Sequence, residues 1–412
     1  RLAEVLAVSV REQILRPVSK LTYPVREEGF ESTFRRRQRE ISKHYKEVAQ
    51  REIEKRFGNQ SHEDCEKEQH LETVIAKTSE LVEIRVALME NGIEDTNGST
   101  YSFTLHPGDW QKENFSMHIP KAGMYSLSIT FSKRARVTFG VLSMLPFDHF
   151  HGMRRDVIEC MKEIGVSMLR WPGGNFAGEY RWQDGLLDAD ERAPLEAYME
   201  NETQPYTNGY DYNEVGIDEF IALCREIGAE PFLTINLANA SPEENAAWVE
   251  YCNGADDTRY GKLRAQRGHK DAYQVRYWSL GNEMGYGHME GPMTPGQYVM
   301  LARRHMRAML DVSPDLQLFS SGPYPSEEWG TKSAKELAEN VKYASLHHYT
   351  YVPLDYSSDE AAKNTCQAIM DAPKEAYRLI KEMRTCLGNN IHISFDEWNC
   401  WYAWYRPSSA AE

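Results

Sequence analysis

From about residue 146 onward, short apolar runs alternate with amphipathic stretches. The runs are rich in branched and aromatic residues and predict strands, whereas the stretches between them repeat their apolar positions with the period of a helix. The predicted strands span 167–171, 230–237, 275–280, 316–322, 342–349 and 390–395, and the predicted helices span 151–166, 216–229, 241–253, 294–310, 333–341 and 372–387. Apolar strands separated by helices predict a parallel α/β fold. Because no GxGxxG fingerprint is present, a (β/α)8 barrel is favoured over a nucleotide-binding sheet.

A different pattern precedes this region. Between residues 82 and 145, short runs alternate apolar and polar residues, and clusters of turn-forming residues separate them. Regular short strands of this kind are typical of a small β-sandwich. We therefore divide the chain into a charged, mainly helical segment at 1–81, a β-sandwich at 82–145 and a (β/α)8 TIM barrel at 146–412.

Composition and charge narrow the class of protein. The chain has 412 residues and a formal net charge of -15, which disfavours a nucleic-acid or anionic-membrane partner. No apolar stretch reaches the roughly 18 residues that a membrane-spanning helix needs. The seven cysteines lack CxxC spacing, so they indicate neither a zinc site nor a disulfide framework. The first residues form no clear signal peptide, so localisation stays open. The oligomeric state also stays open.

Polar side chains gather where the predicted strands end, which is where barrel enzymes place their chemistry. The strand ends supply Arg170 and Asn175, then Asn236, then Asn282 and Glu283, then His347, His348 and Tyr349, and finally Asp396, Glu397, Trp398 and Trp401. Hydrogen-bonding groups interleaved with flat aromatic rings suit a sugar ligand. The sequence therefore predicts a carbohydrate site on one rim of the barrel.

Two carboxylates at strand ends, Glu283 and Glu397, suit glycoside hydrolysis, in which one acid donates a proton and the other attacks or activates water. A single strand-end glutamate is more often a structural hydrogen-bonding group, so the prediction depends on the pair. Asp396 is expected to point away from Glu397, because successive strand side chains alternate, and we interpret it as structural. The same alternation lets only one of His347 and His348 face the rim.

Five stretches carry a resemblance to a known family: "GMRRDVIECMKEIGVSMLRWPGGNFAGEYRWQDGL", "AAWVEYCN", "YWSLGNEMGYG", "SLHHYTY" and "SFDEWNCWY". In their order and spacing they resemble the α-L-arabinofuranosidases of glycoside hydrolase family 51. The resemblance implies a retaining enzyme on a (β/α)8 barrel, acting on arabinose-containing plant polysaccharides or oligosaccharides. It implies no metal or organic cofactor. It also makes the segment 82–145 look like a carbohydrate-binding-module-like insert.

The resemblance also implies a role for each matching residue. Glu283 would be the general acid/base and Glu397 the nucleophile, with Arg170 beside the nucleophile. Sugar binding would fall to the remaining matches, which are Asn175, Asn282, His347, Tyr349 and Trp401. Within this set Asn282 would hydrogen-bond the 2-hydroxyl, and His347 and Tyr349 would flank the nucleophile.

The match has gaps at both ends of the barrel. No segment fits the family's first strand, and the chain stops soon after "SFDEWNCWY", so we expect a barrel that is incomplete at strands 1 and 8. The predicted activity is release of terminal arabinofuranosyl residues from arabinan or arabinoxylan by double displacement. Two alternatives stay open: another retaining glycosidase of the same clan, such as an endoglucanase or β-xylosidase, and a non-catalytic carbohydrate-binding barrel.

Overall fold

The computed structural model describes residues 69–90, 93–94, 100–119, 125–193, 195–196, 210–285, 293–322, 327–352 and 358–402. The chain divides into two compact units, one ending at Arg155 and the other beginning at Asp156. The predicted helical segment lies outside the described residues as far as position 68. Among the described helices, none combines the length and the apolar character needed to cross a membrane.

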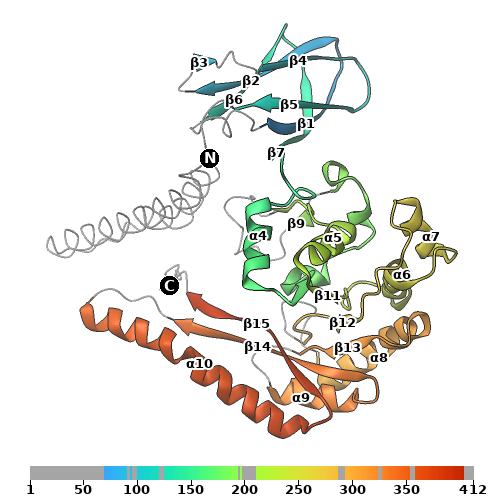
Figure 1. Cartoon of the computed structure of the whole chain (residues 1–412), viewed down its shortest axis with the longest axis vertical. Coiled ribbons are helices and arrows are strands. Elements are labelled where there is room, and N and C mark those ends of the chain that lie inside the picture. Colours follow the sequence, from blue (N-terminus) through green and yellow to red (C-terminus); the bar gives the residue numbers. More distant parts are fainter. Residues whose placement is uncertain are drawn as a thin grey trace, which may run out of the picture. The chain divides into compact units, whose positions relative to one another are not determined.

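The first unit is a β-sandwich of antiparallel strands (Figure 1). Its strands are β1 (Gln69–Thr78), β2 (Val82–Glu90), β3 (Ile93–Glu94), β4 (Thr100–Leu105), β5 (Gln111–His118), β6 (Tyr125–Phe131) and β7 (Val137–Pro146). One sheet has the order β5-β1-β7, and in the other β2 pairs with β3, β4 and β6. Alternate residues of β2 are buried, including Ile84 and Val86, and they pack against Phe103 and Phe115 between the sheets.

Strand β1 lies upstream of residue 82, where the sequence placed the start of the sandwich. Its core-facing positions include Val74 and Ala76, but also Glu72, whose residue surface is only 3% exposed. A glutamate in a buried position breaks the apolar–polar alternation by which a strand is recognised. Burial raises the pKa of Glu72 to about 7. The β-sandwich therefore begins earlier than the sequence pattern indicated.

The second unit is an incomplete (β/α)8 barrel built on a six-stranded parallel sheet (Figure 1). Its sheet strands are β8 (Met168–Trp171), β11 (Glu230–Thr234), β12 (Tyr277–Leu280), β13 (Gln317–Ser320), β14 (Val341–Val352) and β15 (His392–Tyr402). Its helices are α4 (Arg155–Ile164), α5 (Ile217–Ile227), α6 (Pro242–Asn253), α7 (Arg259–Gln266), α8 (Pro295–Val312), α9 (Glu327–Glu336) and α10 (Asp359–Leu387). Shorter elements follow β8, namely η1 (Gly174–Gly178), η2 (Asp184–Leu186), η3 (Ala189–Glu191), β9 (Leu195–Glu196) and β10 (Tyr210–Asp211).

The sheet order is β15-β14-β13-β12-β11-β8, so among the described strands β8 and β15 are the two edges. All six predicted strands are confirmed, and each predicted helix has a counterpart. Helix α7 was not predicted, and α9 lies at Glu327–Glu336 instead of 333–341. Helix α10 begins at Asp359 instead of 372, because Pro373 lies inside the helix and not at its start. Strand β15 continues to Tyr402, so Glu397 lies within the strand and not after it.

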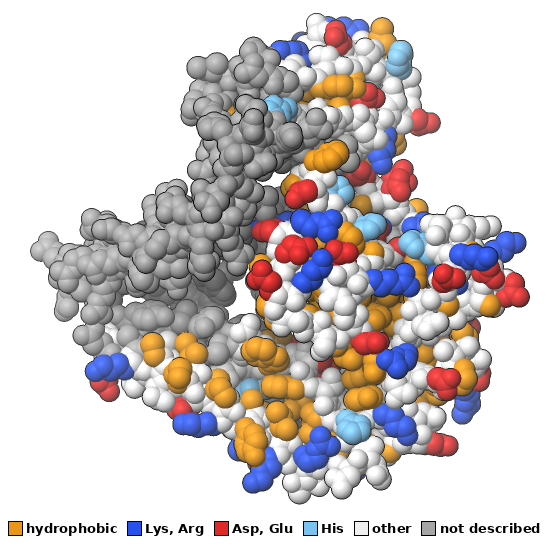
Figure 2. Space-filling model, viewed as in Figure 1, with side chains coloured by type: hydrophobic (Ala, Val, Ile, Leu, Met, Phe, Trp, Pro, Cys, Tyr) orange, Lys and Arg blue, Asp and Glu red, His pale blue; other side chains and the backbone are white. Residues whose placement is uncertain are grey.

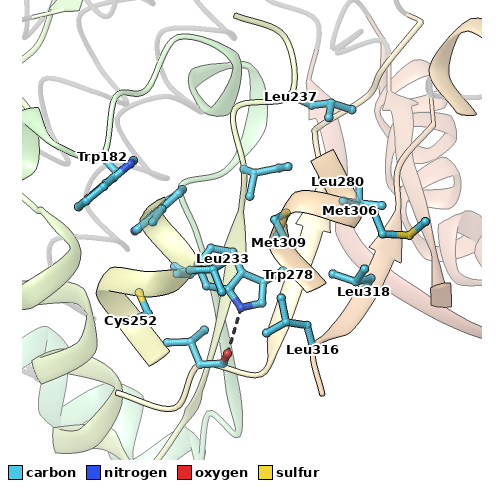
Figure 3. Close-up of a cluster of buried hydrophobic side chains, with 14 of the residues drawn as sticks. Trp182, Leu233, Leu237, Cys252, Trp278, Leu280, Met306, Met309, Leu316 and Leu318 are labelled. Carbon is cyan, nitrogen blue, oxygen red and sulfur yellow. Dashed lines mark hydrogen bonds between the residues drawn. The ribbon is translucent and has the colours of Figure 1, made fainter. Parts of the chain in front are cut away.

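The core of the barrel unit lies between the sheet and its helices, and Figure 3 shows part of it. Trp278 of β12 is fully buried there, and its indole N–H donates to the carbonyl of Val275 at 3.0 Å. Trp248 of α6 lies edge-on to Trp278, with ring centroids 5.5 Å apart. Burial of large aromatic rings anchors β12, whose end carries Glu283. On the face of the molecule in Figure 2, acidic and basic side chains are interspersed.

Candidate active site

Glu283 lies in the turn that follows the buried strand β12. Gly281 (φ 89°) and Glu283 (φ 45°) both adopt left-handed backbone conformations, which are strained for a residue other than glycine. A Cβ on Gly281 would lie 2.7 Å from the sulfur of Met284 and 3.1 Å from the Cβ of Leu237. The glycine thus permits a tight turn, and this turn directs the Glu283 side chain into the site.

Glu397 enters the site from β15 at a β-bulge. Leu346 of β14 pairs with Phe395, but the next residue, His347, pairs with Glu397. Asp396 is therefore an extra residue in β15, and a bulge of this kind changes the face to which the following side chains point. As a result, Asp396 and Glu397 both approach Arg170, at 3.9 Å and 2.6 Å respectively. The prediction that Asp396 points away from Glu397 is wrong, because strict alternation fails at a bulge.

Arg170, at the end of β8, binds groups from three other strands or strand ends. Its Nη1 donates to Glu397 Oε1 at 2.6 Å, its Nη2 donates to Asn282 Oδ1, and its Nε donates to Thr234 Oγ1 at 3.2 Å. The Arg170 side chain is 12% exposed. A planar guanidinium with donors in fixed directions suits this task better than a lysine ammonium. Arg170 therefore fixes the positions of Glu397 and Asn282 relative to the sheet.

His347 lies between the two glutamates. Its Nδ1 is 2.8 Å from Glu283 Oε1 and 3.3 Å from Glu397 Oε2. Burial would lower the pKa of His347, but hydrogen bonds to Asp396 and Glu283 and the charges of the nearby carboxylates raise it to about 9. This raised pKa favours the imidazolium form of His347 at neutral pH. The neighbouring His348 instead has its Nε2 3.1 Å from Thr350 Oγ1, as alternation along the strand requires.

Tyr349 and Asn282 complete the described part of the site. The Tyr349 hydroxyl donates to Glu397 Oε2 at 2.9 Å, and burial followed by the charge of Glu397 raises the pKa of this phenol. Glu397 thus has donors on both oxygens. The Nδ2 of Asn282 is buried and, among the residues that the structure describes, has no hydrogen-bond partner. An unpartnered buried donor is costly, so it is suited to a ligand hydroxyl.

Six of the predicted site residues meet in the structure, and the side chains of two others lie outside its described part. The structure brings together Arg170, Asn282, Glu283, His347, Tyr349 and Glu397. Asn175 lies in η1 and Trp401 in β15, but the placement of both side chains falls outside the described part of the chain. Their predicted sugar contacts therefore stay predictions.

Asn236, a further strand-end candidate, makes its side-chain hydrogen bonds within the protein. Its Nδ2 donates to the carbonyl of Tyr180 at 3.2 Å, and its Oδ1 accepts from the backbone N–H of Asn239 at 2.8 Å. Three residues that sequence reasoning did not assign to the site contact it: Thr234, Ser345 and Asp396. For Ser345 a signal existed, because it stands two positions before His347 and so shares its strand face.

Glu283, His347 and Glu397 each offer one ligand atom, and these atoms lie within 4.8 Å of one another. That spacing would also fit a metal ion. However, Arg170 already supplies a cation at 2.6 Å from Glu397, and a histidine ligates only in its neutral form. The raised pKa of His347 opposes that form. The charge balance therefore favours an acid pair held by an arginine and an imidazolium.

Comparisons with known proteins show that this chain is similar to α-L-arabinofuranosidases. The model of the alpha-L-arabinofuranosidase 1 domain matches residues 160–364. A probable alpha-L-arabinofuranosidase C of Aspergillus terreus is 31% identical over 272 residues, covering 62% of this chain and 52% of the relative. An intracellular exo-alpha-(1->5)-L-arabinofuranosidase of Streptomyces lividans is 33% identical over 264 residues, covering 61% of this chain and 38% of the relative.

Among solved structures, a family 51 alpha-L-arabinofuranosidase from Bifidobacterium longum is 26% identical with a TM-score of 0.52, covering 61% of this chain and 51% of that one. The chain spans about half the length, or less, of the relatives described above. Residues 160–364 include Arg170, Glu283 and His347, whereas Glu397 follows them.

Proposed function

The chain belongs to glycoside hydrolase family 51, and on this premise we propose that it supplies the catalytic centre of a retaining, exo-acting α-L-arabinofuranosidase. The observation that carries the proposal is the proximity of two carboxylates from different strands. One carboxylate oxygen of Glu283 and one of Glu397 lie within 4.8 Å of each other. Retaining glycosidases need a separation of about 5–5.5 Å, whereas inverting enzymes need about 6.5–9.5 Å to admit a water.

Glu397 is the proposed nucleophile. Arg170 Nη1 and the Tyr349 hydroxyl hold its two oxygens in fixed positions, which orients the carboxylate for attack. In the first step Glu397 forms a bond to the anomeric carbon while the bond from that carbon to the leaving-group oxygen breaks. Glu283 donates its proton to that oxygen, so the leaving group departs as a neutral alcohol.

The second step reverses these roles. Glu283, now a carboxylate, takes a proton from water, and the water oxygen attacks the anomeric carbon. The bond to Glu397 breaks, the sugar is released with its original configuration, and both carboxyl groups return to their starting states. The free Nδ2 of Asn282 supports a contact to the sugar 2-hydroxyl, and such contacts strengthen as the transition state forms.

The proposed substrates are terminal arabinofuranosyl residues of arabinan or arabinoxylan. Relatives named as arabinofuranosidases, one of them an exo-(1->5) enzyme, support this class of sugar. A panel of nitrophenyl glycosides tests it in the full-length gene product. Turnover of the α-L-arabinofuranoside is expected. Preference for a β-xyloside or β-glucoside would assign the chain to another retaining glycosidase, and sugar binding without any turnover would make it a carbohydrate-binding barrel.

Azide distinguishes the two carboxylates. With Glu283→Ala, an aryl arabinofuranoside with a good leaving group still forms the glycosyl-enzyme, and azide yields an arabinosyl azide of retained configuration. With Glu397→Ala, ordinary turnover disappears and azide gives at most the inverted product. The opposite pattern would exchange the two roles.

A further inference from the structure

A buried carboxylate, Asp396, lies next to the proposed catalytic pair. Its side chain is 5% exposed, and the bulge in β15 turns it toward the same groups that hold Glu397. Within the described part of the chain its Oδ2 has no hydrogen-bond partner, and this oxygen lies 3.9 Å from Arg170 Nε. A carboxylate this well shielded from water requires nearby positive charge and hydrogen-bond donors. Asp396 lies one residue from the nucleophile, and the proposed bond-making steps leave it unused.

A short chain of polar groups joins Asp396 to His347. The Ser345 hydroxyl donates to Asp396 Oδ1 at 2.7 Å. The Ser345 Oγ lies 3.1 Å from His347 Nε2. This ring nitrogen is also 3.5 Å from Asp396 Oδ1. Because the single hydroxyl hydrogen points to the carboxylate, the Ser345 oxygen accepts from Nε2–H. One ring nitrogen of His347 is thereby fixed as a donor.

The other ring nitrogen faces the reaction. Nδ1 of His347 lies 2.8 Å from Glu283 Oε1 and 3.3 Å from Glu397 Oε2. Among the described residues, the titratable and charged groups around the ring are Asp396 and Glu397 from β15, Glu283 after β12, and Arg170 of β8, which pairs with both acids of β15. Asp396 and Glu397 face the imidazole as carboxylates, and Glu283 can accept from Nδ1–H even while it holds its acidic proton, so these groups favour the imidazolium.

We infer that Asp396 is a positioning residue, which acts with Ser345 to hold His347 protonated on both ring nitrogens and so directs Nδ1–H at the two catalytic carboxyl groups. The inference rests on the proposed function for the roles of Glu283 and Glu397. The carbonyl oxygen of a carboxylic acid accepts a hydrogen bond better than its hydroxyl oxygen, so donation from Nδ1–H to Oε1 of Glu283 favours the acidic proton on Oε2. From Oε2 the proton can be transferred to the glycosidic oxygen. A neutral His347 with a bare Nδ1 would instead take up the Glu283 proton in a hydrogen bond.

The imidazole nitrogens can be followed directly by ¹⁵N NMR of the full-length protein labelled in histidine, with His347→Asn identifying the signal. In the wild type both nitrogens of His347 should stay protonated through neutral pH. In Asp396→Asn, which keeps the shape but removes the charge, the pKa of His347 should fall by at least one unit, a tenfold loss of proton affinity. Ser345→Ala should give a smaller shift in the same direction, and it preserves the test if Asp396→Asn fails to fold.

Asp218→Asn is the matched control, because Asp218 is also buried and accepts hydrogen bonds from Tyr251 and Tyr273 in a different part of the unit. It should leave the pKa of His347 unchanged. In kinetics, Asp396→Asn should move the alkaline limb of kcat/KM to lower pH, whereas Asp218→Asn should not. An unchanged His347 pKa in both Asp396→Asn and Ser345→Ala would overturn the inference. If the wild type cleaves no arabinofuranoside while the NMR shift still appears, the proposed function fails and the stabilisation of protonated His347 by Asp396 stands.

Discussion

Arg170 and Glu397 lie on the two edge strands of the sheet, β8 and β15, yet Nη1 of the arginine is 2.6 Å from Oε1 of the glutamate. Edge strands of a flat six-stranded sheet would be more than 20 Å apart, since neighbouring strands are about 4.8 Å apart. The contact therefore shows that the sheet curves until its edges nearly meet. The same ion pair joins the edges and positions the proposed nucleophile.

Replacing Arg170 by alanine should impair turnover more than folding. We expect kcat/KM to fall about 100-fold or more, equivalent to about 2.7 kcal/mol of barrier. The loss of stability should stay below the roughly 3–5 kcal/mol typical of a broken buried pair, because Tyr349 still donates to Glu397. Arg276→Ala is the control, since it removes an exposed pair with Glu230 and should alter neither quantity measurably. Wild-type kinetics in Arg170→Ala would disprove the assigned role.

Asn282→Ala should remove recognition of the sugar 2-hydroxyl. In the wild type, an aryl 2-deoxyarabinofuranoside should be a far poorer substrate than the parent glycoside, by roughly 100-fold, because the buried Nδ2 loses its partner. In Asn282→Ala the two substrates should differ much less. Asn236→Ala should lower stability without changing this ratio, because both amide atoms of Asn236 bond to the protein. An unaltered ratio in Asn282→Ala would place the 2-hydroxyl elsewhere.

Gly281→Ala should displace Glu283 as well as strain the backbone. Gly268 provides a matched control, because it has a similar φ of 95° but nothing within 4 Å of an added Cβ. Both substitutions should lower the free energy of unfolding by about 1–2 kcal/mol, because alanine is strained in the left-handed conformation. At Gly281 the contact with Met284 should add about 1–3 kcal/mol and reduce activity. Equal losses of stability and activity in the two variants, measured by urea unfolding and initial rates, would contradict this reasoning.

The free energy of unfolding should fall as pH rises from about 6.5 to about 9, where His347 is still charged in the folded state but already neutral in the unfolded state. The pKa of His347 is raised from 6.5 to about 9 in the folded protein, so the folded state binds an extra proton between these values. Its contribution is fully present below pH 6.5 and is lost by pH 9, with an upper bound of about 3 kcal/mol. Urea unfolding at pH 6 and pH 9 measures it. The decrease should be smaller in His347→Gln; an equal decrease would exclude His347 as its source.

Much of the barrel could be predicted from the sequence, because local patterns control local structure. Strand β12 and helix α8 follow from a buried apolar run and from a Thr294 cap followed by Pro295. Glu283 was identifiable because a carboxylate follows a buried strand within a glycine turn. Strand β1 was missed for the opposite reason, since Glu72 occupies a core position that local pattern assigns to an apolar residue.

The sequence by itself determined the order of strands and helices and the parallel sheet, and it singled out two glutamates as candidates, since periodicity and motif are properties of neighbouring residues. Only the tertiary structure decided which side chains meet. The contact of Arg170 with Glu397 depends on the curvature of the whole sheet, over a separation of 227 residues. The position of Asp396 depends on a bulge in the pairing of β14 with β15, and pairing register is set between strands, not within one. Asn236 was removed from the candidates by hydrogen bonds of its side chain to Tyr180, which lies 56 positions away along the chain, and to Asn239, because a hydrogen-bonding side chain can satisfy the fold or a ligand, and only three-dimensional contacts determine which.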